Sequence, residues 1–446
     1  MENIYIQYMY SYPHKTAYRS LEGVDLKDYG EYLKGKGHGL YLHIPFCQTK
    51  CGYCNLFSVT GQSKEAVDRY LDGVEVQIKQ YREMLTAAGT EFSCFTIGGG
   101  TPLILSGEQL ERMFAMVEGN LVLERNPEIV IETAPNQTTK EKLELLKRRG
   151  VTRVSMGIQS FQEEELKTLR RSHSAGQARK ALQLLKGFDF SCVNLDFIYG
   201  IPGQTRETLL ESLREAAAWG ADEIFLYPLY VKHGAGLLKD MREGMVLEPK
   251  EAVKEYETGA GYLMDMGYRQ DSMRRFVRKG AETRKFSDCG FGTSLALGCG
   301  GRSYLGSLHF CTPYAITKTD CIKELERFEN TRDFTKITHG IFLSEEERKR
   351  RYVIRHLLIR PGIPENMYKQ FFGTEILRDF PILETWIREG FLNRDHGFLT
   401  LTDEGMKRSD SLGPKLISPE IRKRMDEWDE RHGENHDSVQ RQLKKL

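Results

Sequence analysis

Short apolar runs alternate with longer amphipathic, charged stretches between residues 39 and 227. The apolar runs have the length of strands, and glycines follow several of them, at 98–100, 157 and 200. Strands that alternate with helices form βαβ units, whose strands lie parallel in one sheet. Six such units predict an α/β fold, a partial (β/α)6 barrel rather than the full eight. In barrels of this kind the loops at the C-terminal ends of the strands carry the chemistry.

The predicted strands cover residues 39–44, 92–97, 128–132, 153–157, 192–198 and 223–227. The predicted helices cover residues 63–88, 106–117, 139–149, 162–171, 174–185 and 206–219.

The alternation fades after about residue 232, and we expect irregular structure up to about residue 333, with a glycine-rich patch at 290–306. A second pattern follows, with helices at 344–358 and 375–389 and a strand pair at 390–402. It predicts a small winged-helix-like domain, which we expect to be a structural cap because it lacks a concentrated basic helix. The predicted organisation is an N-terminal extension (1–37), a barrel (38–235), a barrel extension (236–335), the winged-helix-like domain (336–432) and a polar tail (433–446).

Charge and hydropathy exclude several classes of protein. The chain has 64 basic and 63 acidic residues, so no overall field attracts nucleic acid. It has no apolar run of about 18 residues that could cross a membrane. Its first residues lack the basic and apolar segments of a secretory signal. We therefore expect a cytoplasmic protein with no nucleic-acid partner and no membrane span.

Three of the nine cysteines, Cys47, Cys51 and Cys54, lie within eight residues. Thiols stay reduced in the cytoplasm, and an odd number cannot pair completely. Three thiolates at this spacing can hold a [4Fe–4S] cluster and leave one iron open to the amino and carboxylate groups of a methionyl moiety. The alternatives are a zinc site with a distant fourth ligand, or chance spacing.

This cysteine motif, with Tyr53 before its last cysteine, resembles the signature of the radical S-adenosylmethionine (SAM) superfamily. Segments 41–46 (Tyr-Leu-His-Ile-Pro-Phe) and 98–102 (Gly-Gly-Gly-Thr-Pro) resemble the oxygen-independent coproporphyrinogen III oxidase family, and the likeness runs from about residue 11 to 410. The resemblance implies a radical SAM barrel, a [4Fe–4S] cluster on the three cysteines, and a SAM molecule with a second one beside it. It also implies a low-potential electron donor such as flavodoxin or ferredoxin.

By this resemblance, the positions that match the first SAM site and the cluster surroundings are Tyr41, Tyr53, Gly99, Gly100, Thr101 and Glu132. Glycines let backbone carbonyls approach a ligand closely, and carbonyls at 99–101 would accept hydrogen bonds from the SAM ammonium. A plain tight turn is the alternative for the glycines. Core packing is the alternative for the tyrosines, and a surface position at a strand end is the alternative for Glu132.

Thr101, Gln159, Arg171 and Asp196 match the second SAM site. Gln159 and Asp196 follow or interrupt apolar strands, where polar side chains need a polar partner. Arg171 ends a predicted helix, so an interaction with the helix C-terminus is the alternative. No residue is assigned a catalytic role.

The family reaction uses one electron from the reduced cluster to split SAM into methionine and a 5′-deoxyadenosyl radical. The radical takes hydrogen from a propionate β-carbon of coproporphyrinogen III, and loss of CO₂ and an electron leaves a vinyl group. A tetrapyrrole with four carboxylates would need basic partners. Candidates are His14, Lys15, Arg19, Arg274, Arg275 and Arg302, with ordinary solvated surface as the alternative.

Two features point in opposite directions. Segment 11–13 (Ser-Tyr-Pro) resembles the N-terminal segment of true coproporphyrinogen oxidases, but Leu56 stands where those enzymes carry another cysteine. Three hypotheses therefore stay open: a coproporphyrinogen III oxidase or close tetrapyrrole-acting enzyme; a two-SAM enzyme for methyl transfer, cyclisation or haem opening; and a haem chaperone.

Overall fold

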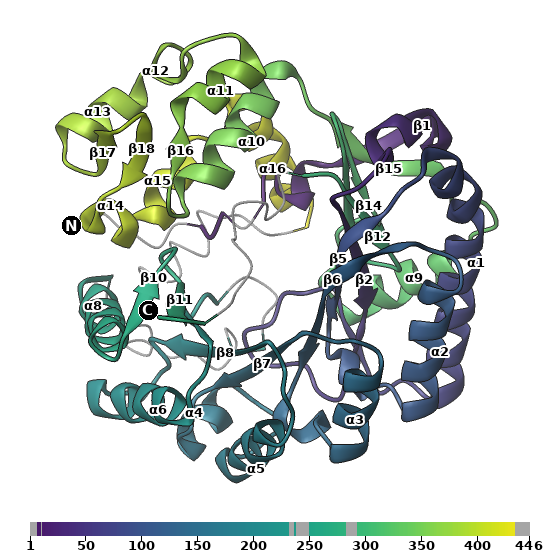
Figure 1. The fold of residues 1–446 in the computed structure, drawn as a ribbon, viewed down its shortest axis with the longest axis horizontal. Helices are drawn as coiled ribbons and strands as arrows, with labels where there is room; N and C mark the ends of the chain where they lie inside the picture. Colours follow the sequence, from purple (N-terminus) through teal and green to yellow (C-terminus); the bar gives the residue numbers. More distant parts are fainter. Residues whose placement is uncertain (1–6, 10, 232–235, 238–248, 282–291, 433–446) are drawn as a thin grey trace.

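A thirteen-stranded sheet forms the main body of the protein in the computed structural model, which describes residues 7–9, 11–231, 236–237, 249–281 and 292–432 (Figure 1). The strand order is β1-β15-β14-β13-β12-β2-β5-β6-β7-β8-β9-β11-β10. Six neighbouring central strands are parallel, and they are the six predicted from sequence: β2 (His38–Ile44), β5 (Phe92–Gly99), β6 (Leu123–Thr133), β7 (Arg153–Gln159), β8 (Cys192–Tyr199) and β9 (Glu223–Pro228). The sheet stays open at both ends, so the predicted partial barrel is confirmed.

The connecting helices lie on the outer face of the curved sheet (Figure 1). They are α1 (Lys64–Ala88), α2 (Gly107–Glu118), α3 (Lys140–Arg148), α4 (Glu163–Thr168), α5 (Ala175–Lys186) and α6 (Arg206–Trp219). The prediction of one helix over 162–171 was too long: α4 ends at Thr168, because Arg170 takes a left-handed conformation at φ 53°. The early end releases Arg171 from the helix.

The expectation of irregular structure from residue 232 to 333 was wrong for the residues that the structure describes. This part of the chain forms α8 (Pro249–Asp265), β10 (Tyr268–Gln270), β11 (Arg275–Arg278), β12 (Ser294–Leu297), β13 (Arg302–Leu305), β14 (Leu308–Cys311) and α9 (Lys318–Glu329). These strands have three or four residues each, which is too short to show an alternating pattern. They are held by distant partners, since β12 pairs in parallel with β2 and β11 pairs antiparallel with β9.

The predicted N-terminal extension (1–37) and the predicted winged-helix-like domain (336–432) each contribute a strand to the main sheet. After η1 (Lys15–Ala17), β1 (Arg19–Asp25) pairs antiparallel with β15 (Lys336–Phe342), and η2 (Leu26–Leu33) leads to β2. Thus β15 belongs to the sheet rather than to the C-terminal helices that follow it. Short elements frame the loops at the strand ends: β3 (Phe46–Cys47), β4 (Val59–Thr60), η3 (Pro102–Ile104) and η4 (Pro135–Gln137).

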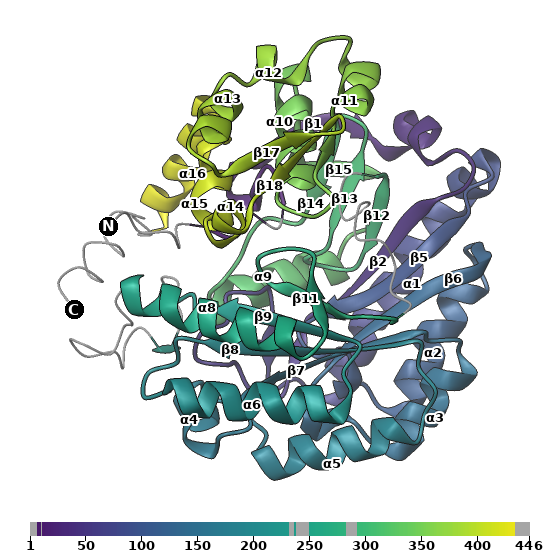
Figure 2. The same ribbon diagram turned by 60° about the vertical axis from the view of Figure 1, so that its left-hand side comes forward.

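The C-terminal helices and a three-stranded sheet pack above the main sheet (Figure 2). The elements are α10 (Glu345–Leu357), β16 (Ile363–Pro364), α11 (Glu365–Phe372), α12 (Ile376–Asp379), α13 (Ile382–Arg388), β17 (Leu392–Asp395), β18 (Phe398–Leu401), α14 (Asp403–Lys407), α15 (Ser409–Lys415) and α16 (Pro419–Arg431). The predicted strand pair is present as β17 and β18. The single helix predicted over 375–389 is instead two helices, with Pro381 between them. No helix in the described part of the chain is long and apolar enough to span a membrane.

Candidate functional site

The cysteine loop begins at the end of β3 and carries all three clustered thiols. Cys47, Cys51 and Cys54 are each partly exposed, and none of the eight cysteines that the structure describes forms a disulfide. Burial, together with the negative charges of Cys51 and Cys47, raises the pKa of Cys54 to about 11. The three thiols are therefore close enough to interact, and metal binding would offset the cost of their deprotonation.

The donor set fits an iron–sulfur cluster better than a single ion. Within the described residues, no three His, Cys, Asp or Glu side chains lie close enough together to hold one metal ion. The thiolates around a [4Fe–4S] cluster bind separate irons and are spaced more widely than the ligands of one zinc ion. Three thiols on one loop could each bind one iron of such a cluster, which would leave the fourth iron without a protein ligand.

The glycine loop (residues 98–101), at the end of β5, packs directly on the cysteine loop (residues 47–54). The Gly100 amide donates to the Ile44 carbonyl at 2.8 Å, and the Thr101 amide donates to the Phe46 carbonyl at 2.8 Å. A Cβ atom on Gly100 would lie 2.6 Å from the Phe46 oxygen and 2.8 Å from Cys47 Sγ. Glycine is therefore required at 100 by the close approach of the cysteine loop, and not by an ordinary turn.

Glu132, the last residue but one of β6, lies against the same glycine loop. The Gly99 amide donates to Glu132 Oε2 at 3.1 Å, and a Cβ atom on Gly98 would lie 2.8 Å from the Glu132 carboxyl carbon. Burial raises the pKa of Glu132 to about 7, the Gly99 hydrogen bond opposes this, and the charge of Asp196 adds to it. A buried carboxylate of this kind favours a cationic partner.

Arg171 joins the cysteine loop to the end of β7. Its Nη1 donates to Cys51 Sγ at 3.1 Å, and its Nη2 donates to the Gly157 carbonyl at 2.7 Å. The alternative that Arg171 interacts with the C-terminus of its preceding helix, α4, is therefore not what these hydrogen bonds show. Its charge also lowers the pKa of Tyr53, which burial raises. Tyr53, Arg171 and the thiols thus form one contiguous group.

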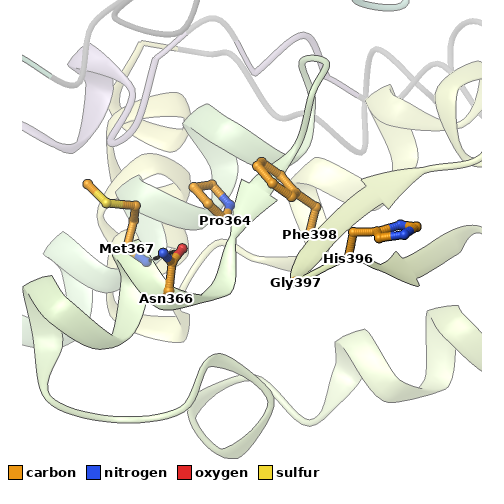
Figure 3. A pocket seen from close by; sticks show the side chains of 6 residues that line it. All are labelled: Pro364, Asn366, Met367, His396, Gly397 and Phe398. Atoms are coloured by element: carbon orange, nitrogen blue, oxygen red, sulfur yellow. Dashed lines mark hydrogen bonds between the residues drawn. The ribbon is translucent and has the colours of Figure 1, made fainter.

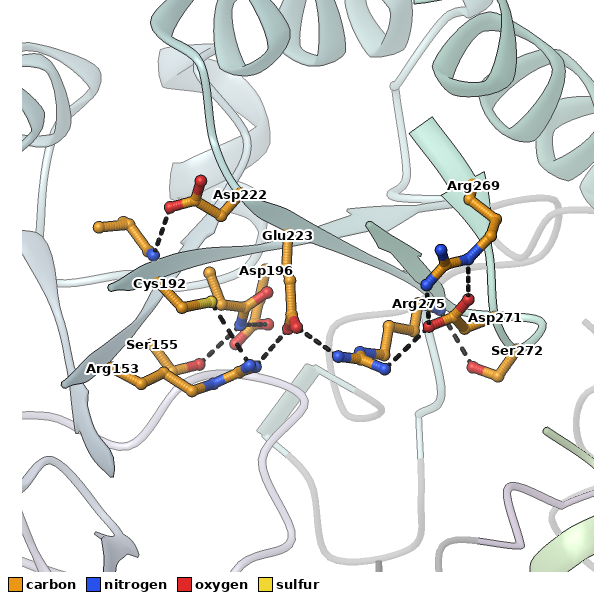
Figure 4. A network of polar contacts seen from close by, with 12 residues as sticks. Arg153, Ser155, Cys192, Asp196, Asp222, Glu223, Arg269, Asp271, Ser272 and Arg275 are labelled. Atoms are coloured by element: carbon orange, nitrogen blue, oxygen red, sulfur yellow. Dashed lines mark hydrogen bonds and ion pairs between the residues drawn. The ribbon is translucent and has the colours of Figure 1, made fainter. Parts of the chain in front are cut away.

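Asp196 belongs to a chain of polar side chains across β7 and β8 (Figure 4). Asn194 Nδ2 donates to Asp196 Oδ1 at 2.9 Å and to Ser155 Oγ at 2.6 Å. Burial raises the pKa of Asp196 to about 6, and the Asn194 hydrogen bond and the charges of Arg153 and Arg171 oppose the rise. Our reading of the sequence missed Asn194, although a second polar residue in an otherwise apolar strand was a visible signal.

Gln159 lies at the end of β7, where the pairing with β8 shifts register. Its φ of 71° is left-handed, a conformation that non-glycine residues adopt only when the surrounding structure imposes it. A Cβ atom on Gly157 would lie 2.7 Å from the side-chain Nε2 of Gln159. The Gln159 amide and the Arg171 guanidinium therefore meet at Gly157.

Tyr41 is held by a histidine from its own strand. The Tyr41 hydroxyl lies 3.1 Å from His43 Nδ1, and His43 Nε2 lies 3.0 Å from the Phe57 carbonyl. Because a carbonyl can only accept, Nε2 carries the proton and Nδ1 accepts from the Tyr41 hydroxyl. His43 is a further site residue that our assignments from sequence did not include.

The basic candidates for carboxylate binding divide into two groups. Arg274 pairs with Asp410 of α15, Arg275 pairs with Glu223 and Asp271, and Arg19 pairs with Glu427. These three therefore have structural partners, and Figure 4 shows the Arg275 network. His14 Nδ1 lies 3.0 Å from Thr16 Oγ1. Lys15 donates to the Gly300 carbonyl and Arg302 Nη1 donates to Ser11 Oγ, and both residues lie near Tyr41.

A separate surface hollow lies in the C-terminal region (Figure 3). It is lined by Pro364, Asn366, Met367, His396, Gly397 and Phe398. None of the predicted site residues contributes to it. The candidate site is therefore the group at the C-terminal ends of the parallel strands.

Comparisons with known proteins show which family the chain resembles. Residues 41–216 match the model of the radical SAM superfamily. A heme chaperone HemW from Mycobacterium tuberculosis is 34% identical over 281 residues, which cover 61% of this chain and 71% of the relative. The oxygen-independent coproporphyrinogen III oxidase of Escherichia coli is 25% identical over 430 residues, which cover 90% of this chain and 91% of the relative. The solved structure of coproporphyrinogen III oxidase (HemN) from Escherichia coli has the same fold, with a TM-score of 0.79 at 21% identity over 91% of this chain and 96% of that chain.

Proposed function

Because the chain belongs to the radical SAM superfamily, in the branch that contains the HemW heme chaperones and the oxygen-independent coproporphyrinogen III oxidases, we propose that it cleaves SAM in order to act on a tetrapyrrole. Membership of this family implies a [4Fe–4S] cluster and SAM. The reaction proposed first is oxidative decarboxylation of propionate side chains, as in porphyrin biosynthesis. The observation that carries the proposal is the packing of the glycine loop on the cysteine loop. Arg171 contacts the cysteine loop at Cys51 Sγ, and Glu132 accepts a hydrogen bond from the glycine loop at the Gly99 amide.

Each group in the site has a role that its surroundings support. Cys47, Cys51 and Cys54 would hold the cluster, which when bound supplies the electron for reductive cleavage of SAM. The Arg171 guanidinium donates to Cys51 Sγ and stabilises its negative charge. Glu132 provides an anionic acceptor for the SAM ammonium at the glycine loop.

A second SAM would lie on the side of Arg171 and Asp196. Asn194 orients the Asp196 carboxylate, which suits hydrogen bonds from ribose hydroxyls. The side chain of Gln159 approaches Gly157, where Arg171 also binds. Thr101 Oγ1 lies 3.7 Å from Cys47 Sγ, at the start of the cysteine loop. A low-potential flavodoxin or ferredoxin would supply the electron.

The test is anaerobic reconstitution followed by mass analysis of the products with coproporphyrinogen III and with haem. The proposal expects iron and sulfide to bind the unaltered protein but not a variant with all three cysteines replaced by alanine. It expects 5′-deoxyadenosine whose formation depends on the tetrapyrrole. Uptake of zinc without iron, or iron content unchanged in the triple variant, would contradict it.

A haem chaperone is the second candidate, and one residue favours it. Leu56 stands two residues beyond the last cysteine of the loop, where true oxidases carry another cysteine, and it is 51% exposed. A stable one-to-one haem complex without formation of protoporphyrinogen would support this second candidate. S-adenosylhomocysteine as the product would indicate methyl transfer instead.

A further inference from the structure

Three cations from distant segments meet beside the extension of the main sheet. Lys15 comes from η1, Arg302 from β13 and Arg351 from α10. The Arg351 guanidinium lies 4.6 Å from the centre of the Tyr304 ring, and the Arg302 guanidinium lies 6.0 Å from it. We refer to Lys15, Arg302 and Arg351 as the cationic cluster.

The cationic cluster adjoins the SAM site at Tyr41. Lys15 Nζ donates to the Gly300 carbonyl at 2.5 Å. The next residue, Gly301, packs on the Tyr41 ring so closely that a Cβ atom there would lie 3.1 Å from Tyr41 Cδ1. Arg302 follows directly, and its charge lowers the pKa of Tyr41, which burial raises. A ligand at the cluster would therefore lie next to the tyrosine.

The cationic cluster concentrates positive charge in a place that solvent still reaches. Burial, with a smaller contribution from the charge of Arg302, lowers the pKa of Lys15 to about 8. Burial, together with repulsion from Arg355 and Arg302, lowers the pKa of Arg351 to about 10. Lys15, Arg302 and Tyr304 are nevertheless partly exposed. A bound anion would relieve this repulsion.

Two neutral groups add hydrogen-bonding capacity at the same place. His309 Nε2 lies 3.4 Å from Arg351 Nε, and His309 Nδ1 is buried with no hydrogen-bond partner among the described residues. The hydroxyl of Tyr18 is also buried without such a partner, and the charges of Arg302 and Arg351 both act on it. Buried polar atoms of this kind normally find a partner in a ligand or in water.

We propose that the cationic cluster is a carboxylate-binding site, which holds a propionate of the tetrapyrrole substrate beside Tyr41. The planar guanidinium of Arg302 has five N–H donors, and its Nη1 donates to Ser11 Oγ. This geometry suits a carboxylate, and Lys15 adds a second charge. The aromatic ring of Tyr304 provides an apolar surface next to them. This inference rests on the proposed function and specifies how its substrate is recognised.

The test compares haem with haem dimethyl ester, which has no free carboxylate, in absorbance titrations of the reconstituted protein. We expect the unaltered protein to bind haem at least about tenfold more tightly than the ester. Lys15→Gln and Arg302→Gln should lose most of this preference, whereas Lys15→Arg should keep part of it. Lys36→Gln is the control, because Lys36 is exposed and pairs with Glu91 at 3.1 Å.

Each outcome either supports the inference or overturns it. Equal affinity for haem and its ester in the unaltered protein overturns it without any variant. So does an unchanged preference in both glutamine variants, if their iron content and circular dichroism match those of the unaltered protein. Loss of SAM affinity with haem affinity intact would assign the cluster to the SAM carboxylate and overturn the inference as well. If the unaltered protein binds neither haem nor coproporphyrinogen, the proposed function itself fails.

Discussion

Replacing Gly100 with alanine tests whether the glycine loop holds the cysteine loop in place. The added Cβ atom would lie 2.6 Å from the Phe46 oxygen and 2.8 Å from Cys47 Sγ. The backbone of the cysteine loop would have to move by about 0.8 Å, from 2.6 Å to the 3.4 Å of an ordinary contact. Steric crowding of this kind costs about 1–3 kcal/mol, and each weakened backbone hydrogen bond adds about 1 kcal/mol.

We therefore expect Gly100→Ala to lower the free energy of unfolding by about 2–4 kcal/mol. It should also lower the iron and sulfide bound after anaerobic reconstitution, because Cys47 is displaced. Urea unfolding followed by circular dichroism measures the first effect, and iron and sulfide analysis measures the second. Gly107→Ala is the matched control, since a Cβ atom there meets nothing within 4 Å. If both variants bind iron equally and unfold within about 0.5 kcal/mol of each other, the reasoning is refuted.

Three further predictions concern charge in and around the site. Arg171→Met removes the hydrogen bond to Cys51 Sγ, so the cluster potential should become more negative in a redox titration; an unchanged potential would contradict this. Burial raises the pKa of Glu132 to about 7, from 4.5. Without SAM, the folded state therefore binds the Glu132 proton more tightly than the unfolded state does, and the stability that this proton contributes should be lost as pH rises from about 4.5 to about 7. Glu132→Gln should remove this part of the pH dependence of the free energy of unfolding, measured by urea unfolding. Glu223→Gln should destabilise the protein by about 3–5 kcal/mol, because Glu223 pairs with both Arg153 and Arg275 in the interior. Its loss removes the ion pair of Arg153 and leaves Arg275 with Asp271 alone. The control Glu215→Gln removes a partly exposed ion pair with Arg179 and should cost less than about 1 kcal/mol; equal losses in the two variants would contradict the prediction for Glu223.

Local sequence determined the parallel strands and the cysteine loop. Each central strand is long enough to bury a continuous apolar run, so its position can be read without knowledge of its neighbours. The spacing of Cys47, Cys51 and Cys54 places three thiols on one loop whatever surrounds them. The prediction that they form a metal-binding group could therefore be made from sequence alone.

Tertiary structure decided how the side chains of the site combine. Arg171 reaches Cys51 across 120 positions, and Lys15 reaches Gly300 across 285. The short strands β12–β14 had no readable pattern, yet they bring the glycine patch and Arg302 to Tyr41. Contacts of this kind leave no periodic trace in the chain, because the free energy that fixes them comes from packing between segments and not from the propensity of either one.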